Sequence, residues 1–155
     1  NFVSICISDR KSGGQIVSKH SIVIDVFKIL GYILHSHKIW VKGTGVNDYR
    51  INYQHIMTFS RKKKKRKPVA DFKPDVFIVN QSKYKAYSYG MPVRIIELLV
   101  SNYTDKNDIV YDPFMGSGTT AEACENTRRR WIGSEIDEKY GELVKERMGL
   151  GAEDL

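Results

Sequence analysis

The stretch from Ile109 to Tyr140 constrains the fold of this chain more than any other segment. A β-branched pair, Ile109-Val110, leads into a turn that carries Gly116 and Gly118, and a helical pattern begins directly after the turn. Glycine allows the backbone to approach a ligand where any side chain would collide. The turn then brings that ligand to the positively polarised N-terminus of a helix. This order predicts a cradle for a nucleotide cofactor.

The residues that follow the glycines support this interpretation. The six residues from Gly116 to Ala121 match the dinucleotide fingerprint G-x-G-x-x-G/A. Glu135 ends the next expected strand, where the two oxygens of a carboxylate can accept from both hydroxyls of one ribose. We also expect Thr119 to cap the helix, with Glu122 completing a capping box. A lone Gly-x-Gly turn is often only a tight strand-to-helix connection, but the whole order of elements disfavours that alternative here.

The spacing of apolar residues and turn residues predicts an α/β fold. We expect strands at 2–8, 32–41, 54–60, 109–111 and 131–136, and helices beginning at Ser21, Pro92, Thr119 and about Asp137. The strands at 32–41 and 54–60 are expected to pair antiparallel, and those at the cofactor end to be parallel. Gly13-Gly14 is expected to form a turn. The periodic pattern breaks down from Arg61 to about Tyr89, which is typical of a specialised insertion.

Composition places few limits on function. The chain has 155 residues, 41% of them hydrophobic and 28% charged, which suits one domain of a cytoplasmic protein. No apolar run approaches the roughly 18 residues of a membrane span, and no signal peptide is visible, so no membrane partner is expected. We expect Cys6 and Cys124 to be reduced core thiols. The four histidines are scattered in the sequence, so metal ligation is not expected.

The net charge of +7 and the isoelectric point near 9.4 favour a polyanionic partner, most simply nucleic acid. Much of the excess lies in one run, which consists of Arg61, Lys62, Lys63, Lys64, Lys65, Arg66 and Lys67. In many proteins such a run is only a solvated loop. The alternative is a loop that contacts phosphates, which gives affinity but no sequence information.

The residues ahead of the glycines narrow the choice of cofactor. Asp112-Pro113-Phe114 closely resembles the start of the Asp-Pro-Phe-x-Gly-Ser-Gly-Thr-Thr signature of the DNA amino-methyltransferases, which make N6-methyladenine or N4-methylcytosine. In that family the loop holds S-adenosylmethionine, and the next motif, which Trp131 to Glu135 resembles, binds the cofactor ribose through its acid. The resemblance implies a cofactor site formed by Asp112, Pro113, Phe114, Gly116, Ser117, Gly118, Thr119 and Glu135.

The late position of this motif resembles the β-type order of the family, in which the catalytic half comes first and the cofactor motif last. The resemblance implies a Rossmann-like, S-adenosylmethionine-dependent methyltransferase sheet that is circularly permuted and carries an irregular target-recognition insertion. Residues 1–155 would form a single partial domain, with the insertion at 43–88 and the cofactor-binding region at 89–155. The basic run at 61–67 then falls where the family contacts double-stranded DNA.

One motif of the family is missing. Its catalytic tetrapeptide, Asp/Asn/Ser-Pro-Pro-aromatic, needs a Pro-Pro pair, and the prolines at 68, 74, 92 and 113 are all isolated. No residue is therefore assigned as catalytic, and a turn-capping role is expected for Asp9. We expect the chain to be the C-terminal part of a longer reading frame or one piece of a split enzyme. Its partner would be an N-terminal catalytic segment or subunit, and alone it should bind the cofactor weakly and methylate nothing.

Two other functions remain open from the sequence. A non-catalytic nucleic-acid-binding subunit could retain the same fold. An NAD-dependent oxidoreductase fragment would also explain Gly-x-Gly-x-x-Ala and Glu135, but only about 20 residues follow Glu135 and a dinucleotide fold needs a second half.

Overall fold

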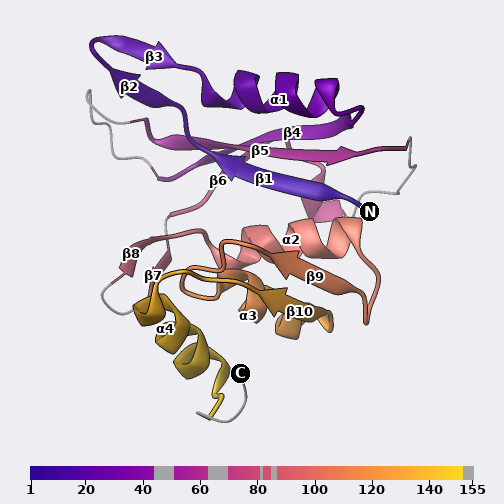
Figure 1. The fold of residues 1–155 in the computed structure, drawn as a ribbon, viewed down its shortest axis with the longest axis vertical. Coiled ribbons are helices and arrows are strands. Elements are labelled where there is room, and N and C mark those ends of the chain that lie inside the picture. The colour runs from indigo at the N-terminus through magenta and orange to yellow at the C-terminus, as the bar shows by residue number, and fades with distance from the viewer. Residues whose placement is uncertain (44–50, 63–69, 81, 85–86, 152–155) are drawn as a thin grey trace. The chain divides into compact units, whose positions relative to one another are not determined.

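The computed structural model describes residues 1–43, 51–62, 70–80, 82–84 and 87–151 (Figure 1). The chain divides into two compact units, Asn1–Asn80 and Gln81–Leu155. Both units combine strands with helices, so the α/β class is confirmed. Among the residues described, no helix combines the length and the apolarity that crossing a membrane requires.

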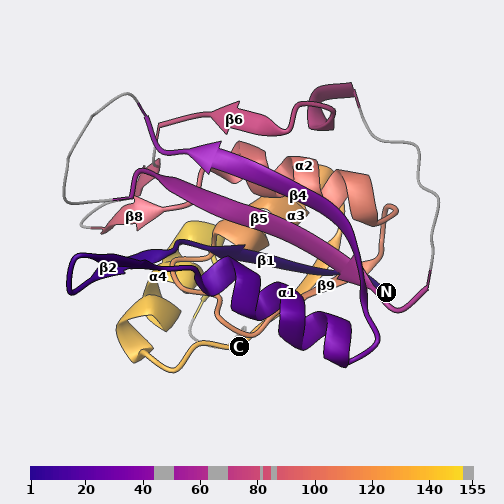
Figure 2. The same cartoon turned by 90° about the horizontal axis from the view of Figure 1, so that it is seen from above.

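The first unit is built on a mixed sheet. Within its described part the strand order is β1-β5-β4-β6, which the view in Figure 2 shows side by side. The strands are β1 (Val3–Ile7), β4 (Ile33–Val41), β5 (Tyr53–Ser60) and β6 (Val76–Ile78). β5 is antiparallel to β1 and to β4, so the predicted antiparallel pair is confirmed, whereas β6 is parallel to β4. β5 lies within the range 43–88, so this part of the expected insertion belongs to the sheet.

One helix, α1 (Lys19–Ile29), covers a face of this sheet (Figure 1). His55, Met57 and Phe59 share a face of β5 because successive side chains of a strand point to opposite sides. Phe27 of α1 stacks on Phe59, with the ring centroids 4.3 Å apart. Phe59 is buried and Phe27 is half-buried, and removing this apolar surface from water favours the packing of helix on strand.

The chain between β1 and α1 contains an element that the sequence pattern did not predict. β2 (Arg10–Ser12) and β3 (Gln15–Val17) form an antiparallel hairpin around the expected Gly13-Gly14 turn. Asp9 precedes the hairpin, but its carboxylate accepts from the backbone N–H of His20, in the first turn of α1. Asp9 therefore serves the start of the helix and not the glycine turn, which corrects the role expected for it.

The second unit contains β9 (Ile109–Asp112) and β10 (Arg130–Gly133), which pair in parallel as predicted. Its helices are α2 (Val93–Tyr103), α3 (Thr119–Thr127) and α4 (Glu138–Met148). A short antiparallel pair, β7 (Ser82–Tyr84) and β8 (Tyr87–Gly90), precedes α2. A parallel pair joined by a helix is the unit that places a glycine turn at the carboxyl end of a strand.

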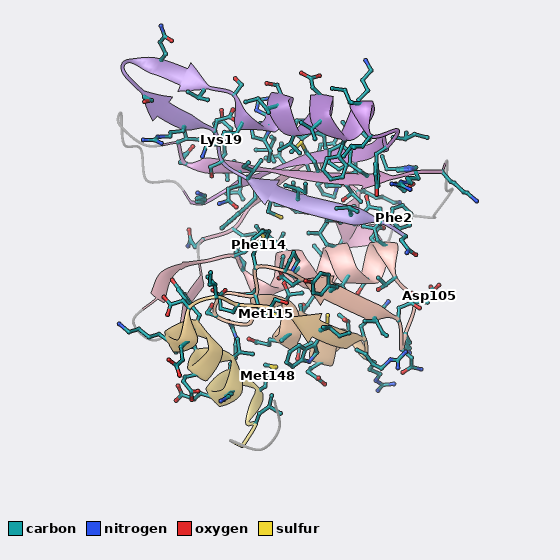
Figure 3. The ribbon with its side chains drawn as sticks, viewed as in Figure 1. Phe2, Lys19, Asp105, Phe114, Met115 and Met148 are labelled. Atoms are coloured by element: carbon teal, nitrogen blue, oxygen red, sulfur yellow. The ribbon has the colours of Figure 1, made fainter. Side chains whose placement is uncertain are left out.

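A small apolar cluster holds the glycine turn against the last helix. Met115, Ala121 and Val144 are buried together, and Trp131 and Met148 pack against them. Figure 3 labels Met115 and Met148 within this unit. A β-carbon added at Gly133 would lie 2.3 Å from the Met115 Cε atom and 3.3 Å from its Cβ atom, so the Met115 side chain packs directly against this glycine and would have to move for a larger residue.

Three local predictions are wrong in detail. β10 ends at Gly133, so Glu135 lies beyond the strand and not at its last position. Gly118 is the N-cap of α3 and Thr119 is its first helical residue, so the expected capping box does not form. Cys124 is buried, and burial raises the pKa of its thiol to about 11, but Cys6 is exposed because it lies on the outward-facing side of β1.

Candidate functional site

The glycine turn joins the carboxyl end of β9 to α3, which is the arrangement expected of a cofactor cradle. Gly116 and Gly118 both have positive φ, 55° and 82°. Residues that carry a side chain rarely adopt a positive φ, which is why glycines occupy the two positions. The N–H groups of the first turn of α3 have no acceptors within their own helix, as at every helix start, and they are available to a ligand.

Asp112 shapes the loop from its beginning. Its Oδ1 atom accepts from the Phe114 backbone N–H at 3.0 Å, and its Oδ2 atom accepts from the Thr120 hydroxyl at 2.6 Å. One carboxylate therefore joins the end of β9, the loop and the first turn of α3. Asp112 determines the course of the backbone in addition to any direct contact with a cofactor.

Glu135 holds the other side of the loop. Its Oε2 atom accepts from the Gly116 N–H at 2.7 Å, and its Oε1 atom accepts from the N–H groups of Ile136 and Asp137 at 2.9 and 3.0 Å. The N–H groups of Asp137, Gly116 and Ile136 stabilise the carboxylate and hold the pKa of Glu135 below its usual value. A carboxylate offers about four acceptor positions, so these three bonds leave room for a ligand hydroxyl.

Arg147, at the end of α4, is a site residue that the sequence pattern did not indicate. Its guanidinium donates to the Ser117 carbonyl at 2.8 Å and forms an ion pair with Glu122. Glu122 thus pairs with Arg147 instead of closing a capping box. Nothing in the sequence marks Arg147, because an arginine near a helix C-terminus normally serves only the helix dipole.

The loop residues differ sharply in exposure. The side chain of Phe114 is largely in solvent, with the residue 85% exposed, and it extends away from the rest of its unit, whereas Met115 is buried (Figure 3). Ser117 and Thr119 are half-buried beside Arg147, and Pro113 is exposed. The structure therefore brings all eight predicted cofactor residues into one loop and the turn that faces it. An exposed aromatic ring, backbone N–H groups and two carboxylates suit a ligand with a base and a ribose.

The predicted DNA-contacting run is described only in part. Arg61 and Lys62 follow β5 and are exposed, and the Arg61 guanidinium lies 5.2 Å from the centre of the Tyr32 ring. Lys63, Lys64, Lys65, Arg66 and Lys67 lie outside the described residues.

The bonds of Glu135 lead to a prediction about acid. A carboxyl whose pKa is lower in the folded chain than in the unfolded chain stabilises the fold above its unfolded pKa, about 4.3. That stabilisation is lost as the pH falls through the folded pKa. We expect Glu135→Gln to lower the free energy of unfolding by a constant amount above about pH 5, and by less at lower pH. Urea unfolding of both proteins across this range measures the difference, and a difference that stays constant down to about pH 3 would contradict the assignment.

Comparisons with known proteins bear on the family of this chain. The model of the N6/N4 methyltransferase family, described as DNA methylase, matches residues 3–146. The type II methyltransferase M.BamHI of Bacillus amyloliquefaciens is 33% identical over 81 residues, which are 52% of this chain and 19% of that protein. The type II methyltransferase M.MjaI of Methanocaldococcus jannaschii is 24% identical over an alignment that covers 96% of this chain and 60% of that protein. The chain thus spans only part of these relatives.

Two solved structures of DNA methyltransferases have the same fold as this chain. The complex of M1.HpyAVI with S-adenosyl-L-methionine has a TM-score of 0.78 at 26% identity, covering 96% of this chain and 74% of that one. The cytosine-N4-specific PvuII DNA methyltransferase has a TM-score of 0.83 at 17% identity, covering 99% of this chain and 65% of that one. The second likeness concerns the fold alone. Because the family model matches almost the whole chain, including the glycine loop and both strands beside it, this chain belongs to the N6/N4 DNA methylase family.

Proposed function

We propose that this chain supplies the cofactor-binding and DNA-contacting part of an enzyme that methylates an exocyclic amino group of DNA, N6 of adenine or N4 of cytosine. The observation that carries the proposal is the glycine loop from Asp112 to Thr120, which leads into α3. The carboxylates of Asp112 and Glu135 fix its conformation by accepting from the N–H groups of Phe114 and Gly116 and from the Thr120 hydroxyl. The family match over residues 3–146 supports the choice of chemistry.

The proposed cofactor is S-adenosyl-L-methionine, which supplies an electrophilic methyl group on a positively charged sulfur. The residues present fit this molecule. Glu135 retains an acceptor position for a ribose hydroxyl, and Phe114 offers an exposed ring for stacking. The N–H groups of the first turn of α3 could donate to polar parts of the cofactor. Pro113, Gly116, Ser117, Gly118 and Thr119 would form the rest of the contact.

The protein's contribution to such a reaction is physical. Direct transfer to an amino nitrogen needs no covalent bond to the enzyme, so rate enhancement comes from positioning, stabilisation of charge and exclusion of water. The proposed partners are double-stranded DNA, contacted by the run 61–67, and a catalytic segment or subunit that carries the Pro-Pro-aromatic motif. We propose that this chain by itself binds the cofactor without transferring its methyl group.

The test combines binding and turnover on the purified chain. Calorimetric titration is expected to show binding of S-adenosyl-L-methionine and none of NADH, and a radiolabelled methyl group should not be transferred to duplex DNA. Binding of NADH without binding of S-adenosyl-L-methionine would refute the proposed cofactor. Robust methyl transfer by this chain would show instead that it contains a complete catalytic centre.

A further inference from the structure

Three chemically reactive side chains meet in the first unit, which contains no part of the glycine loop. Asp9 follows β1, His20 lies in the first turn of α1, and His55 lies on the face of β5 that α1 covers. The carboxylate of Asp9 is buried, and both of its oxygens lie 2.8 Å from His20 Nδ1. The methylation chemistry proposed above uses none of these groups.

His55 has a buried nitrogen that the rest of the cluster does not satisfy. Its side chain is only 8% exposed, and its Nε2 atom lies 3.4 Å from Asp9 Oδ2. Nevertheless, among the described residues His55 Nε2 has no hydrogen-bond partner. A buried polar atom without a partner is rare in folded proteins and commonly indicates an ion or water. The nitrogen therefore points to a ligand between His55 and Asp9.

The hydrogen bond of His55 Nδ1 indicates the charge of the ligand that would suit His55 Nε2. His55 Nδ1 lies 2.8 Å from His37 Nε2, so one of these two atoms donates a hydrogen to the other. When His55 Nδ1 is the donor, His55 Nε2 carries a lone pair that is directed at an environment containing a carboxylate. Two electron-rich atoms 3.4 Å apart in a buried position call for a positive group between them. A metal cation between the two atoms meets this need.

The donor set and spacing match one class of cation. Two imidazole nitrogens and one carboxylate oxygen form the cluster, and one ligand atom from each residue lies within 4.8 Å of the others. A tetrahedral Zn²⁺ site, with bonds of about 2.0–2.2 Å, separates neighbouring ligand atoms by about 3.4 Å. The 3.4 Å between His55 Nε2 and Asp9 Oδ2 equals that value. The 2.8 Å between His20 Nδ1 and Asp9 Oδ2 is a hydrogen-bond distance, which would lengthen when a metal replaces the proton.

We propose that Asp9, His20 and His55 form a binding site for a divalent cation of the Zn²⁺ class. The cation would join the end of β1, the start of α1 and the strand β5, and would keep its fourth position for water. The side chain of His20 is 24% exposed, which provides a path for entry. His37 is a positioning residue, because its bond to His55 Nδ1 orients that ring and makes its Nε2 a better ligand.

The ring arrangement agrees with this assignment. The rings of His20 and His55 stack with centroids 3.9 Å apart and an interplanar angle of 19°. Stacking places the two rings side by side next to the Asp9 carboxylate, and neutral imidazole is the form that binds metal. The sequence concealed this site because Asp9 and His20 are 11 residues apart and His55 comes from a distant strand.

The test uses the full chain without an affinity tag, stripped with a chelator and then titrated with Co²⁺ and Zn²⁺. We expect one equivalent of Co²⁺ to produce the visible absorption of a four-coordinate site, and Zn²⁺ to displace it and raise the melting temperature by several degrees. Asp9→Asn, which preserves shape, should weaken binding at least tenfold, and His55→Ala should abolish it. His35→Ala is the matched control, because His35 bonds to Ser60 outside the cluster.

A measurement on the unmodified chain keeps the proposal falsifiable if a variant fails to fold. Nitrogen-15 NMR of the imidazole rings should show large Zn²⁺-induced shifts for His20 and His55 and none for His35. Folded wild-type chain that takes up no metal would overturn the proposal and leave the cluster as a hydrogen-bonded Asp–His pair. Equal loss of binding in His35→Ala and His55→Ala would also overturn it, since the metal would then be adsorbed nonspecifically.

Discussion

Gly118→Ala is expected to lower the free energy of unfolding of the second unit by about 1–3 kcal/mol and to weaken S-adenosyl-L-methionine binding at least tenfold. Gly118 has a φ of +82°, which alanine adopts only under strain. An added β-carbon would also lie 3.3 Å from Val144 Cγ2 and 3.5 Å from Arg147 Cδ. Alanine would therefore require the Val144 side chain to shift by a few tenths of an ångström, beside the loop whose backbone the cofactor is proposed to contact.

Two other glycines in the same unit distinguish the effect of backbone strain from the effect of crowding by the added β-carbon. Gly116 has a φ of +55°, and a β-carbon added there would have no neighbour closer than 3.9 Å. Gly116→Ala should therefore cause backbone strain with little crowding, and should lower stability and cofactor affinity less than Gly118→Ala does. Gly141→Ala, within α4, meets nothing within 4 Å and should stabilise the helix by about 0.5–1 kcal/mol. Urea unfolding and calorimetric titration of the three variants give the comparison. Unchanged stability and cofactor affinity in Gly118→Ala would show that the loop is not the binding element.

Neutralising the centre of the basic run is expected to have the largest effect on DNA binding. Replacing Lys63, Lys64 and Lys65 by serine should make the slope of log affinity against log salt shallower by about 2.7, because each lost phosphate contact removes about 0.9. The affinity for different duplex sequences should fall by a similar factor, since phosphate contacts carry no sequence information. Binding of S-adenosyl-L-methionine should not change, because the cofactor loop lies in the other unit.

A charge-matched variant distinguishes local contact from overall attraction. Lys28, Lys106 and Lys139 are exposed and lie outside the run, and their replacement by serine removes the same net charge. Fluorescence anisotropy with a labelled duplex at several salt concentrations measures both slopes. If the two triple variants lose affinity equally, the run contributes only to the general field of the protein and the proposed DNA contact is wrong.

The glycine loop shows why some of the site was predictable from the sequence. Asp112, Gly116 and Gly118 lie within seven consecutive positions, and their roles depend on local backbone geometry that the residue types themselves impose. The α/β class and the parallel pair followed from the same local patterns. Errors arose at element ends and in the choice of side-chain partners. The capping box at Thr119 does not form because the helix begins one residue earlier than expected, with Gly118 as its N-cap, and Glu122 pairs with Arg147 of another helix.

The Asp9, His20 and His55 cluster shows what local pattern cannot provide. Each residue looks unremarkable in its own segment, and Asp9 was expected only to cap a turn. Pairing of β1 with β5 and the packing of α1 on that face bring the three together, because the sheet joins segments far apart in the chain. Proximity of this kind results from hydrophobic packing that is not directional, so spacing alone cannot reveal it.

The sequence by itself determined the cofactor loop, its strand-turn-helix frame and the family, because these depend on residue types at fixed short spacings. Only the tertiary structure decided that Glu135 holds the Gly116 N–H, that Arg147 supports the loop from α4, and that two histidines face a buried carboxylate. The physical reason is that side-chain partners are selected by packing between elements. A sequence pattern indicates which helix or strand each segment forms, but it does not indicate which side chains of different elements come into contact.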